Sequence, residues 1–318
     1  DIDLLLKSVK IQIKPTMNSM DIRRIISDER QLKAVIGMGK NEFHSLLPTF
    51  SQAWYVELKL ASPDRVRKIG GGKKGALKTM EEKLFAVLLY LKTYPTFDVL
   101  GFLTNRERTR ACRSTHFLLQ VLERALGKKF VLPARKITSV EEFFEKFPEM
   151  KDVFPDGTER PVQRPKDAKR RKKLYSGKKK RFTKKAIVVA DEKKRILILT
   201  KSKSGRRHDK RLADKEELFL RLPPEVTAWT DTGFQGVRAQ HAKTQMPKKA
   251  TKNHPLTEEE RQNNRIISSL RIVAEHAIGG MKRLKAAADI YRNRIPRTDD
   301  RLNLLCAGLW NFHLQQTA

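Results

Sequence analysis

The fold of this chain is decided by the stretch KAIVVADEKKRILIL, residues 185–199. Two runs of β-branched and aliphatic residues lie on either side of the polar turn DEKK at 191–194, and this pattern predicts a β-hairpin. A third apolar run, residues 226–230, follows a helical stretch at 209–220, and a long helix is predicted over 258–285. Strands followed by helix, strand and helix predict an α/β domain from about residue 151 onward.

The residues before this domain are predicted to be all-helical. Residues 1–64 show short amphipathic periodicities, and the run RVRKIGGGKKG at 65–75 is interpreted as a basic linker, since it lacks a GxxxxGK[ST] phosphate-binding pattern. Over 65–150, Thr79 is predicted to cap one helix and Thr96 a second, short one. Asn105 suits a turn before a third helix over 107–126. The expected organisation is therefore a helical segment (1–64), a helix-turn-helix domain (65–150) and an α/β domain with basic inserts (151–318).

In a helix-turn-helix unit the third helix enters the major groove of DNA. Its first turns are rich in arginine here, and the predicted DNA contacts are Arg106, Arg108, Arg110 and Arg113. A plain three-helix bundle with a solvated arginine face is the alternative interpretation.

The charge of the whole chain favours nucleic acid as the partner. There are 68 Lys and Arg against 36 Asp and Glu in 318 residues, a formal charge of +32. A surface this positive repels itself unless a polyanion neutralises it. The two cysteines make no zinc or disulfide pattern, the start shows no signal peptide, and the apolar run at 84–91 is too short for a membrane span of about 20 residues. We therefore expect double-stranded DNA as partner, with no membrane and no small-molecule substrate.

Three carboxylates stand out as candidates for metal chemistry. Asp156 lies in a Pro-Asp-Gly-Thr sequence, Asp231 directly follows the predicted strand at 226–230, and Glu275 lies in the middle of the long helix. Oxygen-only ligands of this kind suit Mg²⁺ or Mn²⁺, and two such ions can activate and cleave a phosphodiester. Ordinary turns for the aspartates and a solvated helix surface for the glutamate are the alternatives.

The neighbours of Glu275 support the metal interpretation. Arg271 precedes it by four residues and Lys282 follows it by seven, and at about 100° per residue all three share one face of the helix. Cations on either side of a metal-binding carboxylate suit a phosphodiester substrate, whereas a plain i,i+4 salt bridge is the alternative.

Five motifs appear in one order along the chain: Asp-Gly-Thr-Glu-Arg-Pro (156–161), Tyr-Ser-Gly-Lys-Lys-Lys (175–180), Gly-Arg-Arg-His-Asp (205–209), Asp-Thr-Gly-Phe-Gln-Gly (231–236) and Arg271-(3)-Glu275-(6)-Lys282. Together with the preceding helices, residues of about 65–290 resemble the DDE transposases of bacterial insertion sequences related to the PIF/Harbinger superfamily. Ser268 stands where the family pattern has a tyrosine.

The resemblance implies an RNase H-like domain, a mixed sheet flanked by helices. It places Asp156 on the first strand, Asp231 after the fourth strand and Glu275 on a helix, as the catalytic and metal-binding triad for two Mg²⁺ or Mn²⁺ ions. It also assigns Arg271 and Lys282 to DNA contacts. His208 and Asp209 match a further family motif as possible supporting residues, although an N-cap at Asp209 explains that residue equally well.

A basic segment lies between the first aspartate and the predicted hairpin. Residues 164–185 hold 13 Lys or Arg and one acidic residue, Asp167, for a net charge of +12. We expect contacts to DNA phosphates near the metal site, and the alternatives are a localisation signal or a solvated run. The predicted DNA-binding residues of this segment are Lys169, Arg170, Arg171, Lys172, Lys173, Lys178, Lys179, Lys180 and Arg181.

The leading prediction is therefore a cytoplasmic, nucleoid-associated bacterial transposase that acts as a homodimer on DNA. It would bind the ends of its element, cleave there and join the 3′-hydroxyls to target DNA. The alternatives are a catalytically silent, sequence-specific DNA-binding protein derived from a transposase, and an RNase H-like endonuclease without strand transfer.

Overall fold

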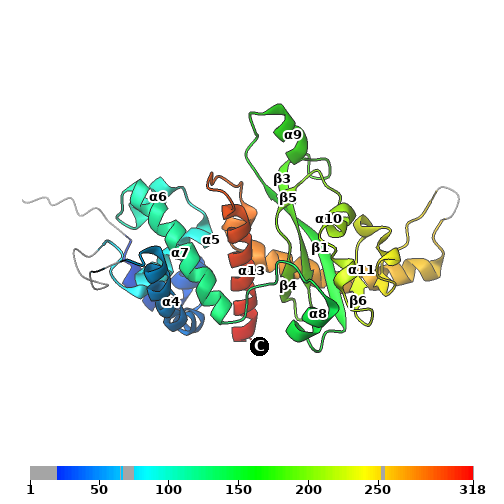
Figure 1. The fold of residues 1–318 in the computed structure, drawn as a ribbon, viewed down its shortest axis with the longest axis horizontal. Coiled ribbons are helices and arrows are strands. Elements are labelled where there is room, and N and C mark those ends of the chain that lie inside the picture. Colours follow the sequence, from blue (N-terminus) through cyan, green and yellow to red (C-terminus); the bar gives the residue numbers. More distant parts are fainter. Residues whose placement is uncertain (1–19, 65, 67–74, 252–254, 318) are drawn as a thin grey trace, which may run out of the picture.

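The computed structural model describes residues 20–64, 66, 75–251 and 255–317. The predicted linker at 65–75 lies outside these residues except for its positions 66 and 75, as do the first 19 residues. None of the helices in the described ranges combines the length and apolar composition that a membrane span requires. The helical part and the sheet lie side by side, with helix α13 (Thr298–Thr317) between them (Figure 1).

A mixed sheet organises the part of the chain that carries the candidate site. Its order is β2-β3-β1-β6-β7, with β4 and β5 both pairing with β3. The β1–β3 and β3–β4 pairs are antiparallel, and the β1–β6 and β6–β7 pairs are parallel. The predicted hairpin and α/β class are therefore confirmed. The strands are β1 (Asp152–Pro161), β2 (Tyr175–Ser176), β3 (Arg181–Ala190), β4 (Ile196–Leu199), β5 (Lys203–Ser204), β6 (Thr227–Trp229) and β7 (Thr244–Gln245).

Strand β3 is apolar on both faces because both faces are covered. Ala186, Val188 and Ala190 belong to the core shared with the helical part, whereas Ile187 and Val189 belong to a second core on the other face. A continuous apolar run is what a strand buried on two sides requires. The second core is formed with helix α8 (Val140–Lys146) and helix α10 (Asp209–Lys215).

The helical part follows the predicted pattern of caps. Thr79 accepts a hydrogen bond from the Glu82 amide at the start of α5 (Met80–Thr93), and Thr96 accepts one from Val99 at the start of α6 (Phe97–Leu103). Asn105 takes a left-handed conformation, with φ of +48°, in the turn before α7 (Arg108–Lys128). The helical order at 79–128 is thus confirmed, and its role in DNA binding stays a prediction.

One helix before this unit is longer than predicted. The sequence predicts only short helices up to residue 64, and α2 (Ile22–Ser27) and α3 (Glu29–Ile36) are short, but α4 (Lys40–Ala61) runs for 22 residues through Pro48. Proline removes one hydrogen bond within a helix. Burial of Phe43 and Phe50 on either side of Pro48 holds the helix together, since tertiary packing supplies most helical stability.

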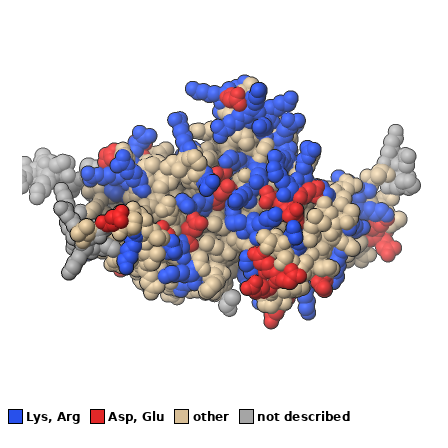
Figure 2. Space-filling view, viewed as in Figure 1, with Lys and Arg blue, Asp and Glu red and all other residues tan. Residues whose placement is uncertain are grey.

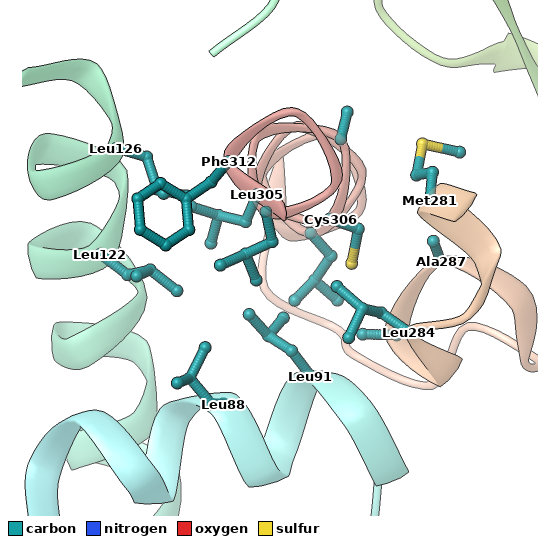
Figure 3. Packing of buried hydrophobic residues seen from close by; sticks show 14 of the residues in the cluster. Leu88, Leu91, Leu122, Leu126, Met281, Leu284, Ala287, Leu305, Cys306 and Phe312 are labelled. Atoms are coloured by element: carbon teal, nitrogen blue, oxygen red, sulfur yellow. The ribbon is translucent and has the colours of Figure 1, made fainter. Parts of the chain in front are cut away.

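The two parts share one hydrophobic core through α13. Figure 3 shows Leu305 and Phe312 of α13 beside Leu122 and Leu126 of α7. On the other side of α13, α11 (Glu258–Lys282) and α12 (Lys285–Ala288) complete the same core (Figure 3). The helical part is therefore packed against the domain that carries the candidate site.

Candidate active site

Asp156 lies within the longest antiparallel pairing of the sheet. It stands on β1 opposite Val188 of β3, and its Oδ1 accepts a hydrogen bond of 2.8 Å from the Gly157 amide. The pKa of Asp156 is raised to about 6, mainly by burial and also by the charges of Asp231 and Asp209, against the opposing effects of the Gly157 amide and Arg271. The predicted placement of Asp156 on the first strand is confirmed.

Asp231 reaches the same region from the neighbouring parallel strand. It follows β6 directly, as the N-cap of a 3₁₀ turn at Thr232–Phe234, and its Oδ1 accepts a hydrogen bond of 2.8 Å from the Gly233 amide. Counting only strands of three or more residues, β6 is the fourth, so the predicted position of Asp231 is also confirmed. Because β1 and β6 run parallel side by side, both aspartates lie toward the same edge of the sheet.

Helix α11 brings two cations to the aspartates. Lys282 donates to the Glu159 carbonyl oxygen at 3.2 Å. Its burial lowers the pKa of Lys282, as does the charge of Lys179, while the charge of Asp156 acts in the opposite direction. Arg271 lowers the pKa of Asp156 from eleven residues earlier on the same helix. The predicted basic face of this helix therefore lies along β1.

Glu275 lies between these two cations but is exposed. Among the described residues, no three Asp, Glu, His or Cys side chains are close enough together to hold a metal ion. The structure thus brings Asp156 and Asp231 together with Arg271 and Lys282, and leaves Glu275 outside this group. The carboxylates of Asp156 and Asp231 fit a hard divalent cation chemically, since such ions take oxygen ligands and each aspartate supplies two carboxylate oxygens.

The sequence left Asp209 and His208 without a firm role, and it did not single out Lys185. Asp209 lies near both aspartates, and its Oδ1 is 2.9 Å from the buried Lys185 Nζ. The N-cap interpretation of Asp209 is wrong, because His208 occupies the N-cap position of α10 and Asp209 is its first helical residue. His208 itself is exposed and makes no side-chain capping bond. The sequence signal for the position of Asp209 was glycine at 157 and 233, where an added Cβ would meet the Asp209 carboxylate.

The basic segment forms an arm beyond the far end of the β1–β3 pairing. It comprises α9 (Ala168–Leu174), β2 and the loop to β3, and it projects from the top of the molecule in Figure 1. Figure 2 shows Lys and Arg side chains gathered over this arm. Of its 13 cations, Lys184 is paired with Asp299 and Lys185 with Glu159 and Asp209; the other eleven have no acidic partner within 4.0 Å among the described residues.

The predicted arginines of α7 divide into two kinds. Arg110 and Arg113 are exposed, and Arg108 is exposed beside Asp98 at 3.5 Å. Arg106 is half-buried: its Nε donates to Thr104 Oγ1 at 2.9 Å and its Nη1 donates to Ser114 Oγ. Arg106 therefore braces the turn before α7, while the other three guanidinium groups are exposed, that of Arg108 beside Asp98.

Comparison with known proteins bears on the family of this region. Residues 155–311 match the family model described as the DDE superfamily endonuclease. The chain is 28% identical over 285 residues, 90% of this chain and 95% of the relative, to the probable transposase for insertion sequence element IS702 of Microchaete diplosiphon. No solved structure is significantly similar to the chain. The matched region includes both aspartates, Asp209 and helix α11, and residues 155–311 belong to the DDE superfamily of endonucleases.

Proposed function

We propose that this protein binds the ends of its mobile element, cleaves the DNA there and joins the 3′-hydroxyl ends to target DNA. The observation that carries the proposal is the convergence of Asp156 and Asp231 from two parallel strands beneath the cations of α11. The domain around them would be RNase H-like. Its mixed sheet, with one aspartate on β1 and one directly after β6, and the glutamate on α11 support this proposal.

The metal ligands of the proposed site are Asp156, Asp231 and Glu275. When bound, two Mg²⁺ or Mn²⁺ ions supply Lewis-acid activation of a water or a 3′-hydroxyl and stabilise the leaving oxygen. Glu275 lies on the helix whose Arg271 and Lys282 act on Asp156, and in the proposed site its carboxylate would complete the set. Arg271 and Lys282 would hold the scissile phosphate.

DNA would reach this site along two basic surfaces. The arm at 164–185 would neutralise backbone phosphates. Lys282 lies close to both the arm and the aspartates, because the charges of Lys179 and Arg181 lower its pKa and that of Asp156 raises it. Arg108, Arg110 and Arg113 of α7 would recognise the element ends in the major groove, with Arg106 as a structural member of that turn. A homodimer would hold two ends, and the protein would work at the bacterial nucleoid.

The test is metal-dependent nicking and strand transfer on DNA that carries the element ends. The parent should require Mg²⁺ or Mn²⁺ and should prefer the end sequence over a scrambled one, and Glu275→Gln should abolish both reactions without loss of DNA binding. A Glu275→Gln variant that cuts like the parent would overturn the triad. Sequence-specific binding without any cleavage would instead support a catalytically silent binding protein, and cleavage without joining would support an endonuclease.

A further inference from the structure

Asp209 lies between the two backbone segments that carry the aspartates. A Cβ atom added to Gly157 would stand 2.6 Å from Asp209 Oδ1, and one added to Gly233 would stand 3.2 Å from Asp209 Oδ2. The Asp209 carboxylate thus lies against Gly157 with its Oδ1 and against Gly233 with its Oδ2. A side chain at position 157 would displace this carboxylate. A side chain at position 233 would meet Asp231 Oδ1 first, at 2.8 Å, and would press more weakly on Asp209.

Lys185 holds Asp209 in that place. Its Nζ lies 2.9 Å from Asp209 Oδ1 and 3.2 Å from Glu159 Oε1, and it donates to the Arg207 carbonyl oxygen at 3.0 Å. Thr183 in turn donates to Glu159 Oε2 at 2.6 Å. All three ionic side chains are at most 10% exposed. Burial alone would lower the pKa of Lys185, but the ion pairs raise it above its ordinary value, so the ammonium stays charged.

A buried cation with two carboxylates is rigid because each member depends on the others. Removing one partner from such a set leaves a charge without compensation in a poorly solvated place. Asp209 is therefore fixed in position before any ligand arrives. It does not form a three-carboxylate cluster with Asp156 and Asp231, since no such cluster exists among the described residues, and its Oδ1 already faces an ammonium group.

We propose that Asp209, anchored by Lys185, is a positioning residue that sets the spacing between Asp156 and Asp231. This inference rests on the proposed function, because it assigns those aspartates to one metal-binding site. Asp209 touches the backbone at both and works through them. Residues that orient metal ligands typically change metal affinity or activity by about 10–100-fold when they are replaced.

The test compares Asp209→Asn with Asp214→Asn, which removes a partly exposed carboxylate of the same helix that pairs with Lys210 and accepts a hydrogen bond from Gln240. Mn²⁺ binding is measured by titration calorimetry, and nicking is measured as kcat and KM for end-containing DNA. Asp209→Asn should weaken Mn²⁺ binding and lower kcat by about 10–100-fold. Its KM for DNA should stay unchanged, whereas a general loss of structure would change all three. Asp214→Asn should behave like the parent.

Unchanged Mn²⁺ affinity in Asp209→Asn would overturn the proposal. If that variant does not fold, Gly157→Ala replaces it, because its methyl group pushes against the Asp209 carboxylate and leaves every charge in place; parent-like Mn²⁺ affinity in Gly157→Ala would equally overturn it. A parent that binds Mn²⁺ but never nicks would contradict the proposed function alone. A parent that nicks, with Asp209→Asn equal to it, would contradict the positioning role alone.

Discussion

The acidic centre consists of Asp156, Asp231 and the Asp209–Lys185–Glu159 set. It and the basic arm lie at different places along the β1–β3 pair, and their charges act in different ways. At the centre, Lys185 is 5% exposed and compensated by two carboxylates. At the arm, eleven cations are left without an acidic partner among the described residues. Burial makes the cost of a misplaced charge large, so charges at the centre fix geometry. Exposed charges are screened and individually weak, so the arm acts through their number.

The largest effect should come from removing one acid at the centre. Asp231→Asn should lower the nicking rate by roughly 10³-fold or more, since metal stabilisation of the transition state is worth several kcal/mol and about 1.4 kcal/mol corresponds to a factor of ten. The same substitution at the arm, Asp167→Asn, should leave the rate unchanged, because asparagine caps α9 as well as aspartate does. Single-turnover nicking of end-containing DNA measures both. Equal losses of nicking rate in the two variants would contradict the difference between the acidic centre and the basic arm.

The second prediction concerns the free energy of unfolding without metal. The pKa of Asp156 is about 6 in the folded protein against an ordinary value of 3.8. Between these values the folded protein keeps a proton that the unfolded chain has released, so stability falls as pH rises from about 4 to 6. At about 1.4 kcal/mol per pKa unit, Asp156→Asn should raise stability at pH 7.5 by on the order of 2–3 kcal/mol.

Urea denaturation in the presence of a chelator, at pH 4 and pH 7.5, measures this effect. The variant and the parent should differ by less than about 1 kcal/mol at pH 4, where the folded parent is protonated at position 156 and the unfolded chain is only partly ionised there. A variant no more stable than the parent at pH 7.5 would show that the charge of Asp156 is not destabilising in the folded protein.

The third prediction contrasts a lysine pair on α9 of the arm with a lysine pair in the turn between β3 and β4. Lys172→Gln/Lys173→Gln, on the arm, should weaken DNA binding about tenfold at low salt and reduce the salt slope by up to about 1.8, at about 0.9 per phosphate contact. Lys193→Gln/Lys194→Gln, in the exposed β3–β4 turn, should have little effect on either quantity. Fluorescence anisotropy over a salt series measures both. The preference for element ends should be the same in both variants, and a changed preference would contradict a purely electrostatic arm.

The smallest effect on the acidic centre should come from Lys184, the neighbour of Lys185 on β3. Its Nζ lies 2.5 Å from Asp299, with a side chain 29% exposed. Lys184→Gln should leave Mn²⁺ affinity unaltered. It should cost about 1–3 kcal/mol of stability, because the Asp299 side chain is only 8% exposed and loses this cation. Thermal unfolding and calorimetry test this. A loss of Mn²⁺ affinity would mean that the centre extends to the opposite face of the strand.

Local patterns explain how much of the molecule could be predicted. Thr79 and Thr96 cap helices through neighbours three residues away, and the hairpin at 185–199 follows from two apolar runs and a polar turn. Asp156 and Asp231 were found because each follows or interrupts an apolar strand next to a glycine. These signals need only a few consecutive residues.

The remainder depends on contacts between distant residues. Lys185 was counted with the basic segment, since its sequence context does not reveal that Asp209 lies 2.9 Å away from it. Arg106 was grouped with its exposed neighbours, although it is bound to Thr104 and Ser114. The role of α13 was also missed, because its apolar residues show no outward sign that they cover α7 as well as α11.

The shared core around α13 has a consequence for synthesis of the chain. Helix α7 ends at residue 128 and α13 begins at residue 298, a separation of 170 residues. At about 5–20 residues per second, the apolar faces of α5 and α7 wait roughly 10–30 s for their last partner. During that interval the helical part has no complete core, so a product terminated before residue 298 should be an early target for proteases and chaperones.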